Sequence, residues 1–578
     1  GMFGQGRAMD AIDQGLNIDA RGFNIFAVGE SGTGKTSTIE RILKERAAGE
    51  PVPDDLLYVY CFRNPTKPRP IFVPPGSGQK LAMDMEGLIQ ELRQRVPRVL
   101  SESLIGHIRA GILGDTRNKA EELLKRASQA AAALNLVIEE EDDTLRVVPL
   151  HDEEPLDPES LETLDRPTRR KIEANMIAFQ EHLDAFSYRR RQLERKHGKT
   201  TLAAEVRVIT PLVEELFTEV MARYQKCGEG VADFLNEAKK HVLENHRSFL
   251  PLEDDEDAED SDAHKPDRYL IYKVNVAVDH TDQVGAPVVV ERIPKPDNLC
   301  GFFEHREAPG GLVTVHTMIR AGAFHQANGG YLLIQASDLL SHQNAWDSLK
   351  RTLRHREIRI EESTVSPESR PREAGTMKPG TVPIKLKTIL VGSGDIYYVL
   401  KTEDDDFGRL FKIKADFEPY MRRSRNNVMK LAQFIGQVCR EEGLLPIHRT
   451  GMLAVLVFAS RNVGHKERLT NRKADLLDLV AEANFFARER RARAIRDTDV
   501  KLAIATRTKR EGTAQDMLHR EIREGTIIIQ TRDTAVGQIN GIALQANGGL
   551  HVHRQRRNGQ HERHRRFFRI LSAIRRDI

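Results

Sequence analysis

The sequence lacks long uncharged apolar runs, and it has few cysteines. No stretch approaches the roughly 18–20 apolar residues that a membrane helix needs, which argues against a membrane-spanning protein. The four cysteines, Cys61, Cys227, Cys300 and Cys439, stand far apart without a C-x-x-C pair, so we expect neither a zinc site nor a disulfide framework. The first residues lack a basic segment followed by an apolar run, and we therefore expect a cytoplasmic protein.

Positive and negative residues are nearly balanced over the whole sequence, except at its end. The net charge is +3, but residues 551–578 hold nine arginines, no lysine, one glutamate and one aspartate, for a local charge of +7. The rest carries −4 and gives no electrostatic reason to expect nucleic acid. Any case for nucleic-acid binding depends on this tail alone, where Phe567 and Phe568 are available for stacking.

At 578 residues the chain is long enough for several packed units. Composition and periodicity predict an α/β part at 1–83, a helical coiled-coil insertion at 84–250, an acidic linker at 251–268, a second α/β part at 269–425, a helical lid at 426–510 and the basic tail at 550–578, which leave residues 511–549 between the lid and the tail. We therefore expect an α/β fold that is interrupted by a long insertion and followed by a small helical domain.

Two heptad runs mark the predicted insertion. They comprise Ile172, Met176, Phe179, Leu183 and Phe186, and then Val213, Phe217, Val220, Tyr224, Cys227, Val231 and Phe234. This spacing predicts two helices that zip into an antiparallel coiled-coil hairpin, either as a spacer or as an arm that grips a substrate or partner. Between the α/β part and these runs, an alternating stretch at 136–150 predicts a small β-hairpin.

The clearest motif is a P-loop. It follows a buried-strand pattern at 23–28, opens a helix at 36–47 and consists of Gly29, Glu30, Ser31, Gly32, Thr33, Gly34, Lys35 and Thr36. Glycines let the backbone N–H groups and the helix N-terminus face a phosphate, while Lys35 supplies a cation and Thr36 a hydroxyl ligand for Mg²⁺. The motif therefore predicts binding of ATP or ADP with Mg²⁺.

The second half of such a site is an apolar strand that ends in carboxylates. The candidate strand is 331–334, which is followed by Gln335 and Ala336 where a magnesium-holding aspartate and a water-orienting glutamate are expected. Both carboxylates are missing, and Asp338 stands two or three positions too late. We therefore expect weak ATP hydrolysis, unless Asp338 or Asp395 substitutes.

Three segments together resemble a known family: the leading Gly-Gln-Gly-Arg-Ala at 4–8, the P-loop, and the Ala-Phe-His-Gln-Ala-Asn-Gly-Gly-Tyr run at 323–331. They are similar to the AAA+ module of Lon-like ATP-dependent proteases, in the branch with a long soluble insertion between the nucleotide motifs. The resemblance covers most of residues 1–550 and implies an AAA+ P-loop NTPase with a C-terminal α-helical lid. It also implies a homo-hexameric ring that acts on polypeptide substrates.

The same resemblance implies roles for four more residues. Gln5 would lie near the adenine, and Ser393 would occupy the sensor position after a strand. Arg472 would be the lid arginine that reaches the γ-phosphate, and Arg409 would be an arginine finger that reaches a neighbouring subunit's site. A plain surface role is the alternative for both arginines.

Residues 525–544 resemble the opening strands of the Lon-type peptidase domain, and the likeness ends near Gly549. In that family the nucleophilic serine and its lysine lie well downstream, whereas Ser572 is the only serine after Gly549 and no lysine follows. An arginine-rich, lysine-free tail is what a shifted reading frame in GC-rich coding sequence would yield. We expect a truncated peptidase domain and no peptidase activity.

Two rival hypotheses stay open at this point. The first is a nucleotide-gated scaffold that holds ATP or ADP with little turnover, which Gln335 and Ala336 favour. The second is a nucleic-acid remodelling AAA+ ATPase that uses the hairpin after 357–361 and the basic tail. Heparin retention that persists after deletion of 551–578 would favour the second hypothesis.

Overall fold

The computed structural model describes most of the chain. The described residues are 4–101, 103–141, 144–151, 154–156, 166–250, 267–308, 311–360, 377–526, 538–544 and 550–556. Nearly all of the predicted acidic linker, and the tail from residue 557 onward, lie outside these ranges. Within these ranges, the helices are too short or too polar to cross a bilayer.

The core is a five-stranded parallel sheet in the order β17-β1-β16-β13-β8. Its strands are β1 (Ile25–Val28), β8 (Val288–Glu291), β13 (Tyr331–Gln335), β16 (Lys387–Gly392) and β17 (Ile413–Asp416). β1 and β16, two of the three interior strands, are almost continuously apolar because helices cover both faces of the sheet. Ile25 and Ala27 face one layer, whereas Phe26 and Val28 face the other. The predicted α/β fold is confirmed.

Helices cover both faces of this sheet. One face packs against α1 (Gly6–Asn17) and α2 (Lys35–Ala47). The other packs against α8 (Pro296–Cys300), α9 (Ala323–Gln326), α10 (Ala336–Ser341), α11 (Ala345–His355), α12 (Gly394–Glu403) and α13 (Phe407–Leu410). The same part of the chain also forms short antiparallel strand pairs: β9 (Phe302–Phe303) with β12 (Ile319–Arg320), β10 (Arg306–Ala308) with β11 (Gly311–Val313), and β14 (Glu357–Ile358) with β15 (Val382–Pro383).

The insertion starts earlier than predicted. A separate antiparallel sheet of β3 (Arg69–Val73), β2 (Asp55–Val59) and β7 (Asn275–Val278) forms its base. The predicted boundary at 83/84 falls inside α3 (Gly78–Ser101) and is therefore wrong. The reason is that β2 is an apolar strand like those of the core, and its composition does not say which sheet it joins.

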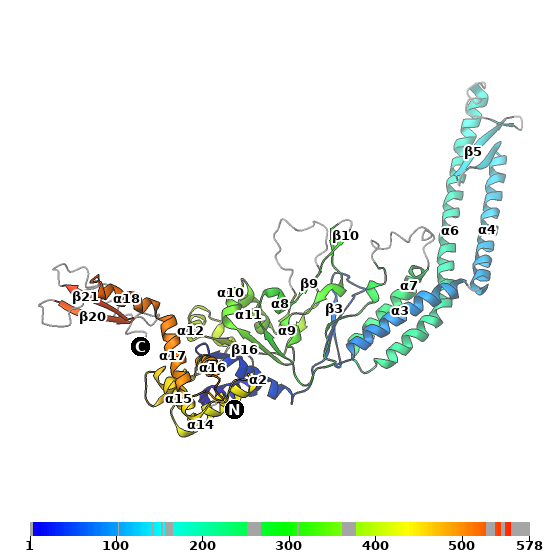
Figure 1. The fold of residues 1–578 in the computed structure, drawn as a ribbon. Coiled ribbons are helices and arrows are strands. Elements are labelled where there is room, and N and C mark those ends of the chain that lie inside the picture. The colour runs from blue at the N-terminus through cyan, green and yellow to red at the C-terminus, as the bar shows by residue number, and fades with distance from the viewer. Residues whose placement is uncertain are drawn as a thin grey trace.

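The predicted pairing of the two heptad runs is also wrong. Both begin on one continuous 58-residue helix, α6 (Arg166–Arg223), and the second run continues into α7 (Glu229–Glu244). The outer half of α6 packs against α4 (Ser103–Ala132), whereas its inner half packs between α3 and α7. One heptad stripe can serve two different partners in succession, and its spacing does not reveal where the partner changes. Figure 1 shows α4 and α6 extending side by side from the core as an arm.

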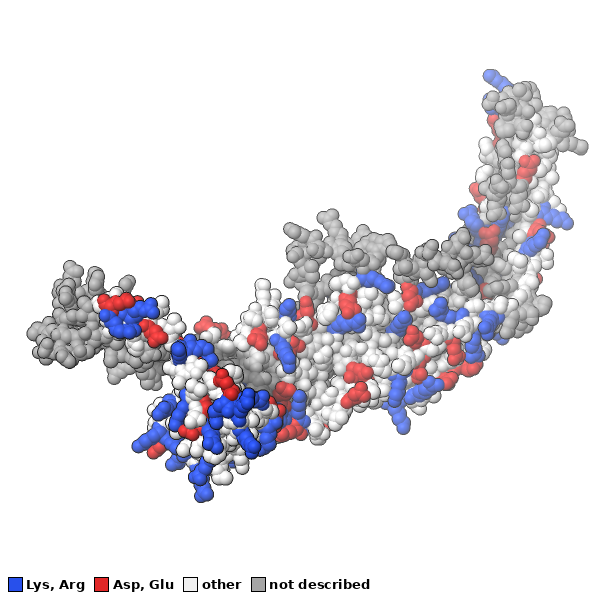
Figure 2. Space-filling model, in the orientation of Figure 1, with Lys and Arg blue, Asp and Glu red and all other residues white. Residues whose placement is uncertain are grey.

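The arm has a thin apolar core and a charged exterior. The predicted hairpin is present near its tip as β4 (Leu136–Glu141) and β5 (Thr144–His151), which also pairs with β6 (Glu154–Pro155). Ala131, Leu136 and Phe179 are buried between the hairpin and the helices. On the face in Figure 2, Lys and Arg are interspersed with Asp and Glu over the described residues of the arm. Pairs four residues apart, such as Arg117 with Glu121, support these exposed helices.

A helical lid follows the core. It consists of α14 (Arg425–Glu441), α15 (Arg449–Arg461), α16 (Lys473–Glu489) and α17 (Asp497–Glu511) around a shared apolar cluster. A two-stranded ribbon of β18 (Tyr420–Arg422) and β19 (Arg468–Thr470) joins the lid to the core. The predicted lid range, 426–510, therefore contains a strand as well as helices. After α18 (Thr513–Arg523), β20 (Gln538–Leu544) pairs with β21 (Leu550–Arg556). The predicted boundary at 549/550 therefore falls between two paired strands.

Asp55 ties the base of the insertion together. Its buried carboxylate accepts hydrogen bonds from the Gly78 backbone N–H (2.9 Å), where α3 begins, and from the His280 backbone N–H (2.8 Å), just after β7. The segments that leave for the arm and return from it thus meet at one side chain. Because an unpaired buried N–H carries its full desolvation cost, this carboxylate matters more than its size suggests.

We predict that Asp55→Asn lowers the free energy of unfolding by about 1–3 kcal/mol, because an amide accepts on only one side. Urea unfolding of the purified variant measures this. Asp54→Asn is the matched control, since the neighbouring Asp54 is exposed. Equal unfolding midpoints for the two variants would contradict the prediction.

Candidate nucleotide-binding site

The P-loop leaves the carboxyl-terminal edge of the sheet between its two neighbours. The Gly29 N–H donates to the Gly392 carbonyl at the end of β16 (3.1 Å). On the other side, the Phe417 N–H donates to the Val28 carbonyl (2.8 Å). This edge is where ligands bind in open α/β sheets.

The loop backbone requires its glycines. Gly32 and Gly34 have φ values of 79° and 76°, in the left-handed region that favours glycine. A side chain at Gly29 would lie 2.9 Å from Cβ of Phe417, so the loop curls tightly against the residue after β17. No side chain caps the first turn of α2, which leaves its N–H groups for a ligand. These features fit a bound phosphate.

Lys35 lies inside the curl of the loop. Its ammonium donates to the Gly29 and Glu30 carbonyls at 2.6 and 2.7 Å, and only 9% of the residue is exposed. Burial lowers the pKa of Lys35, and the nearby Glu30 carboxylate offsets part of this effect. The loop thus holds a cation at its centre.

The structure brings the predicted lid arginine to the P-loop. Arg472 donates from Nε and Nη2 to the same oxygen of Glu30, at 2.6 and 2.5 Å. The Ala474 N–H at the start of α16 also donates to the Gly32 carbonyl (3.3 Å). The lid therefore contacts the loop at two points, and one of them is a charge pair with side chains just under half exposed.

Gln335 at the end of β13 reaches the other key residue of the loop. Its Nε2 donates to Oγ1 of Thr36 at 2.7 Å, so the amide stands where a carboxylate was expected. Ala336 is buried in the core, and a Cβ added at Gly392 would lie 3.2 Å from the Ala336 Cβ. Asp338 accepts instead from Ser337 on α10 (3.0 Å). No cluster of three or more acidic, histidine or cysteine side chains within the described ranges could hold a metal.

Gln5 acts as a clamp rather than as a free amide. It donates to the Glu418 carbonyl and accepts from the Glu418 N–H, both at 2.8 Å. Asn471 of the lid donates to the same carbonyl (3.0 Å). Three segments therefore meet at Glu418: the N-terminus, the exit of β17 and the entrance to the lid.

Ser393 and Arg409 occupy different surroundings. Ser393 follows β16 directly, and its hydroxyl accepts from the Ile396 N–H at the first turn of α12 (3.3 Å). Arg409 is exposed on α13. Within the part of the chain that is described, no hydrogen bond or ion pair joins Arg409 to the P-loop. Ser393 thus directly follows Gly392, whose carbonyl accepts from Gly29 of the P-loop.

A cavity of about 770 Å³ lies at the opposite edge of the sheet. Arg46, Tyr331 and Lys387 line it, and it contains none of the predicted site residues. A Glu50 carboxylate accepts from both Arg46 (3.1 Å) and Tyr331 (2.7 Å). The nucleotide site is therefore assigned from the geometry of the P-loop and not from the size of a cavity.

Three family models match separate parts of the chain. A model described as LonB-like, AAA domain matches residues 284–418, and one described as Archaeal LonB, AAA+ ATPase LID domain matches residues 446–510. A third, described as Lon-like LonC helical domain, matches residues 55–88. The P-loop lies outside all three ranges, so its assignment depends on its own motif and geometry.

Two curated proteins match at low identity. A "Putative Lon protease homolog" of Escherichia coli strain K12 is 24% identical over 242 residues, which cover 39% of this chain and 37% of that protein. An "Archaeal Lon protease" of Methanothermobacter thermautotrophicus is 24% identical over 241 residues, which cover 41% of this chain and 36% of that protein. The chain thus spans little more than a third of the length of these relatives.

Among solved structures, NtrX from Brucella abortus aligns with a TM-score of 0.26 and 16% identity, over 41% of this chain and 51% of that chain. Complexes of NtrX with ATP and with ADP give the same score at 15% identity. This likeness is too small to support an argument.

The parallel sheet, the P-loop and the helical lid define an AAA+ P-loop NTPase fold. More particularly, three parts of the chain are similar to Lon-like AAA+ modules: residues 284–418 to the LonB-like AAA domain, residues 446–510 to the archaeal LonB lid, and residues 55–88 to the LonC helical domain. The predicted resemblance is thereby confirmed.

We predict that Arg472→Ala weakens ATP binding about fivefold, because a partly exposed charge contact is worth up to about 1 kcal/mol. The substitution also leaves the Glu30 carboxylate unpaired beside the phosphates. Titration with a fluorescent ATP analogue measures the affinity. Arg468→Ala is the control, since Arg468 lies over the Tyr420 ring and is exposed. Identical affinities in both variants would refute the assignment.

Proposed function

We propose that the chain binds ATP and ADP at the P-loop and couples their exchange and slow hydrolysis to work on polypeptides. The observation that carries this proposal is the curled loop between β1 and α2, with Lys35 at its centre and the lid in contact with it. Its Lon-like module supports the same reading. The assembly that we propose is a homo-hexameric ring in the cytoplasm.

Each loop residue has a distinct task in this proposal. The backbone N–H groups around Gly32 and Gly34 bind the β-phosphate, and Lys35 neutralises phosphate charge. Thr36 offers its hydroxyl oxygen to Mg²⁺, which supplies further positive charge to the phosphates when bound. Because Gln335 already donates to this hydroxyl, the amide fixes the orientation of Thr36 without adding negative charge.

Slow hydrolysis follows from what the end of β13 offers. A neutral amide at Gln335 does not give the hydrated metal ion the anionic support of an aspartate. The methyl group of Ala336 is buried and does not orient water. Electrostatic and positioning contributions of this kind are worth about 3 kcal/mol, or roughly two decades in rate.

A second candidate function is a nucleotide-gated scaffold. Here the chain holds ATP or ADP and changes the position of the lid without appreciable turnover. The Gln335–Thr36 hydrogen bond favours this candidate, because it completes the contacts of Thr36 without a carboxylate. The first candidate releases phosphate and the second does not, so a measurement of turnover separates them.

Arg409 links adjacent subunits of the proposed ring. Its exposed position on α13 leaves its guanidinium available to the nucleotide of a neighbouring subunit. Such an arginine acts in trans and stabilises the charge that develops on the γ-phosphate. In this arrangement Ser393 remains at the end of β16 as the polar sensor side chain, and Arg472 of the same subunit approaches from the lid.

We predict that Lys35→Ala reduces nucleotide affinity by about 100-fold, since charge-assisted hydrogen bonds to phosphate contribute roughly 1.5–3 kcal/mol. Fluorescent ADP titration in the presence of Mg²⁺ gives the affinity. Lys44→Ala tests the specificity of the effect, because Lys44 lies on the same helix, exposed and paired with Glu40. Unchanged binding in Lys35→Ala would overturn the site assignment.

We predict that Gln335→Asp raises ATP turnover about tenfold, because it restores an anion next to Thr36. Phosphate release under saturating ATP measures the rate. Ser337→Asp serves as the control, since it adds the same charge at an exposed position on α10. Fast turnover in the unmodified protein that neither change affects would show that other carboxylates complete the site.

A further inference from the structure

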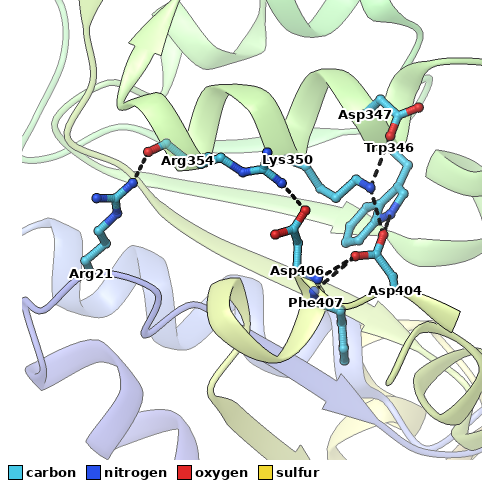
Figure 3. Close-up of polar contacts among 8 residues, drawn as sticks. All are labelled: Arg21, Trp346, Asp347, Lys350, Arg354, Asp404, Asp406 and Phe407. Atoms are coloured by element: carbon cyan, nitrogen blue, oxygen red, sulfur yellow. Dashed lines mark hydrogen bonds and ion pairs between the residues drawn. The ribbon is translucent and has the colours of Figure 1, made fainter. Parts of the chain in front are cut away.

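Asp404 is the centre of a polar network beneath α13. Its Oδ2 accepts hydrogen bonds from Nε1 of Trp346 (2.7 Å) and Nζ of Lys350 (2.8 Å), both on α11. Its Oδ1 accepts from the backbone N–H groups of Asp406 (2.9 Å) and Phe407 (3.2 Å). One carboxylate thus joins α11 to the turn from which α13 starts, as Figure 3 shows.

A second contact continues this network. Asp406 forms an ion pair with Arg354 at the end of α11. The Arg354 carbonyl in turn accepts from Arg21, which lies in the loop between α1 and β1. Lys350 also pairs with Asp347 (3.1 Å). The turn at 404–406 is therefore fixed to α11 at two of its three residues.

Aromatic packing fixes α13 from the side of the sheet. Phe407 is 1% exposed and meets Phe26 of β1 edge to face, with ring centroids 5.6 Å apart. It also stacks on Phe411 at 5.5 Å, just after α13 ends. The packing of Phe407 thus anchors the four-residue helix to the sheet.

The backbone of Arg409 is fixed at a further point. Gly22 approaches it so closely that a Cβ on Gly22 would lie 2.0 Å from the Arg409 carbonyl oxygen. Gly22 has a φ of 80°, which favours glycine, and its own carbonyl accepts from the Lys412 N–H (3.1 Å). Within α13, Phe407 and Leu410 are buried, whereas the Arg409 side chain is exposed to solvent.

Such a short helix has almost no stability of its own. Burial alone raises the pKa of the Asp404 carboxyl, but hydrogen bonds from Lys350 and Trp346 outweigh this and hold its pKa below the usual range. A carboxylate side chain that is only 14% exposed and has four donors costs desolvation, and apolar packing would stabilise the turn as well. What the network adds is a defined direction for α13.

We propose that Asp404 is a positioning residue that sets the direction in which Arg409 leaves α13, so that Arg409 meets the nucleotide of the neighbouring subunit. Trp346 and Lys350 hold Asp404 in this role from α11. The inference rests on the proposed ring function, in which Arg409 acts in trans. It adds that the exposed arginine is aimed by a carboxylate that does not touch nucleotide.

Mixed rings test this proposal. Lys35→Ala subunits have a defective site but an intact α13, whereas Arg409→Ala subunits have an intact site but no finger. We expect little ATP hydrolysis from either alone. A random one-to-one mixture, co-expressed with two affinity tags, recovers about a quarter of wild-type turnover, since about half of the sites are intact and about half of those have a neighbour that carries Arg409.

Asp404→Asn is then expected to behave like Arg409→Ala. Alone, its kcat falls about tenfold while KM and ATP affinity stay unchanged, because its own P-loop is intact. Mixed with Lys35→Ala subunits, it recovers turnover to the same level. Asp405→Asn, an exposed carboxylate one residue along the turn, retains wild-type turnover. Trp346→Phe keeps an aromatic side chain but removes the Nε1 donor to Asp404. This variant replaces Asp404→Asn if Asp404→Asn fails to fold.

The outcomes are distinct. If Arg409→Ala recovers in mixed rings but Asp404→Asn does not, the positioning role is overturned and the ring function stands. If Arg409→Ala itself does not recover, the trans arginine fails and this inference fails with it. Loss of ATP affinity in Asp404→Asn would assign Asp404 to its own subunit's site and would also overturn the proposal.

Discussion

The parallel pairing of β1 with β16 and β17 is the interaction on which the rest of the structure depends. Ile25 of β1 lies opposite Ile389 on one side and Ile413 on the other, so residues hundreds of positions apart flank one short strand. This pairing fixes where the P-loop begins, because its first residue bonds to the end of β16. It also brings the end of β13, the entrance to α12 and the residue after β17 to the same edge. The site is thus a product of strand order and not of any single segment.

The long insertion is compatible with this sheet because its two ends meet. β2 and β7 pair directly, and Asp55 bonds to the segments on either side of the arm. These contacts at the base offset the entropy cost of closing so long a loop. β8 can therefore follow α2 in the core as if the insertion were a single connection. A core of this kind tolerates a large appendage without a change in strand order.

The sequence predicted those features whose determinants are local. The P-loop, the strands that flank it, the lid helices and the hairpin near the arm tip each depend on a short pattern of glycines, apolar residues or alternation. The contacts of the site side chains depend on pairs that no pattern links. Gln5 and Glu418 are 413 residues apart, and Glu30 and Arg472 are 442 apart. The partner of each half of α6 was likewise undetermined, because a heptad stripe specifies a buried face and not the helix that buries it.

The unbroken course of α6 has a mechanical consequence. At about 1.5 Å per residue, its 58 residues extend for about 87 Å, from the base beside the core to the tip. Pro211 removes one backbone hydrogen bond in the inner half, where α6 lies between α3 and α7. Together with α4, against which its outer half packs, α6 forms a stiff rod that is anchored at its base and can act as a lever. A tilt of about 5° at its base displaces its tip by about 8 Å, so rearrangements of a fraction of that size in the core become large movements at the end of the arm.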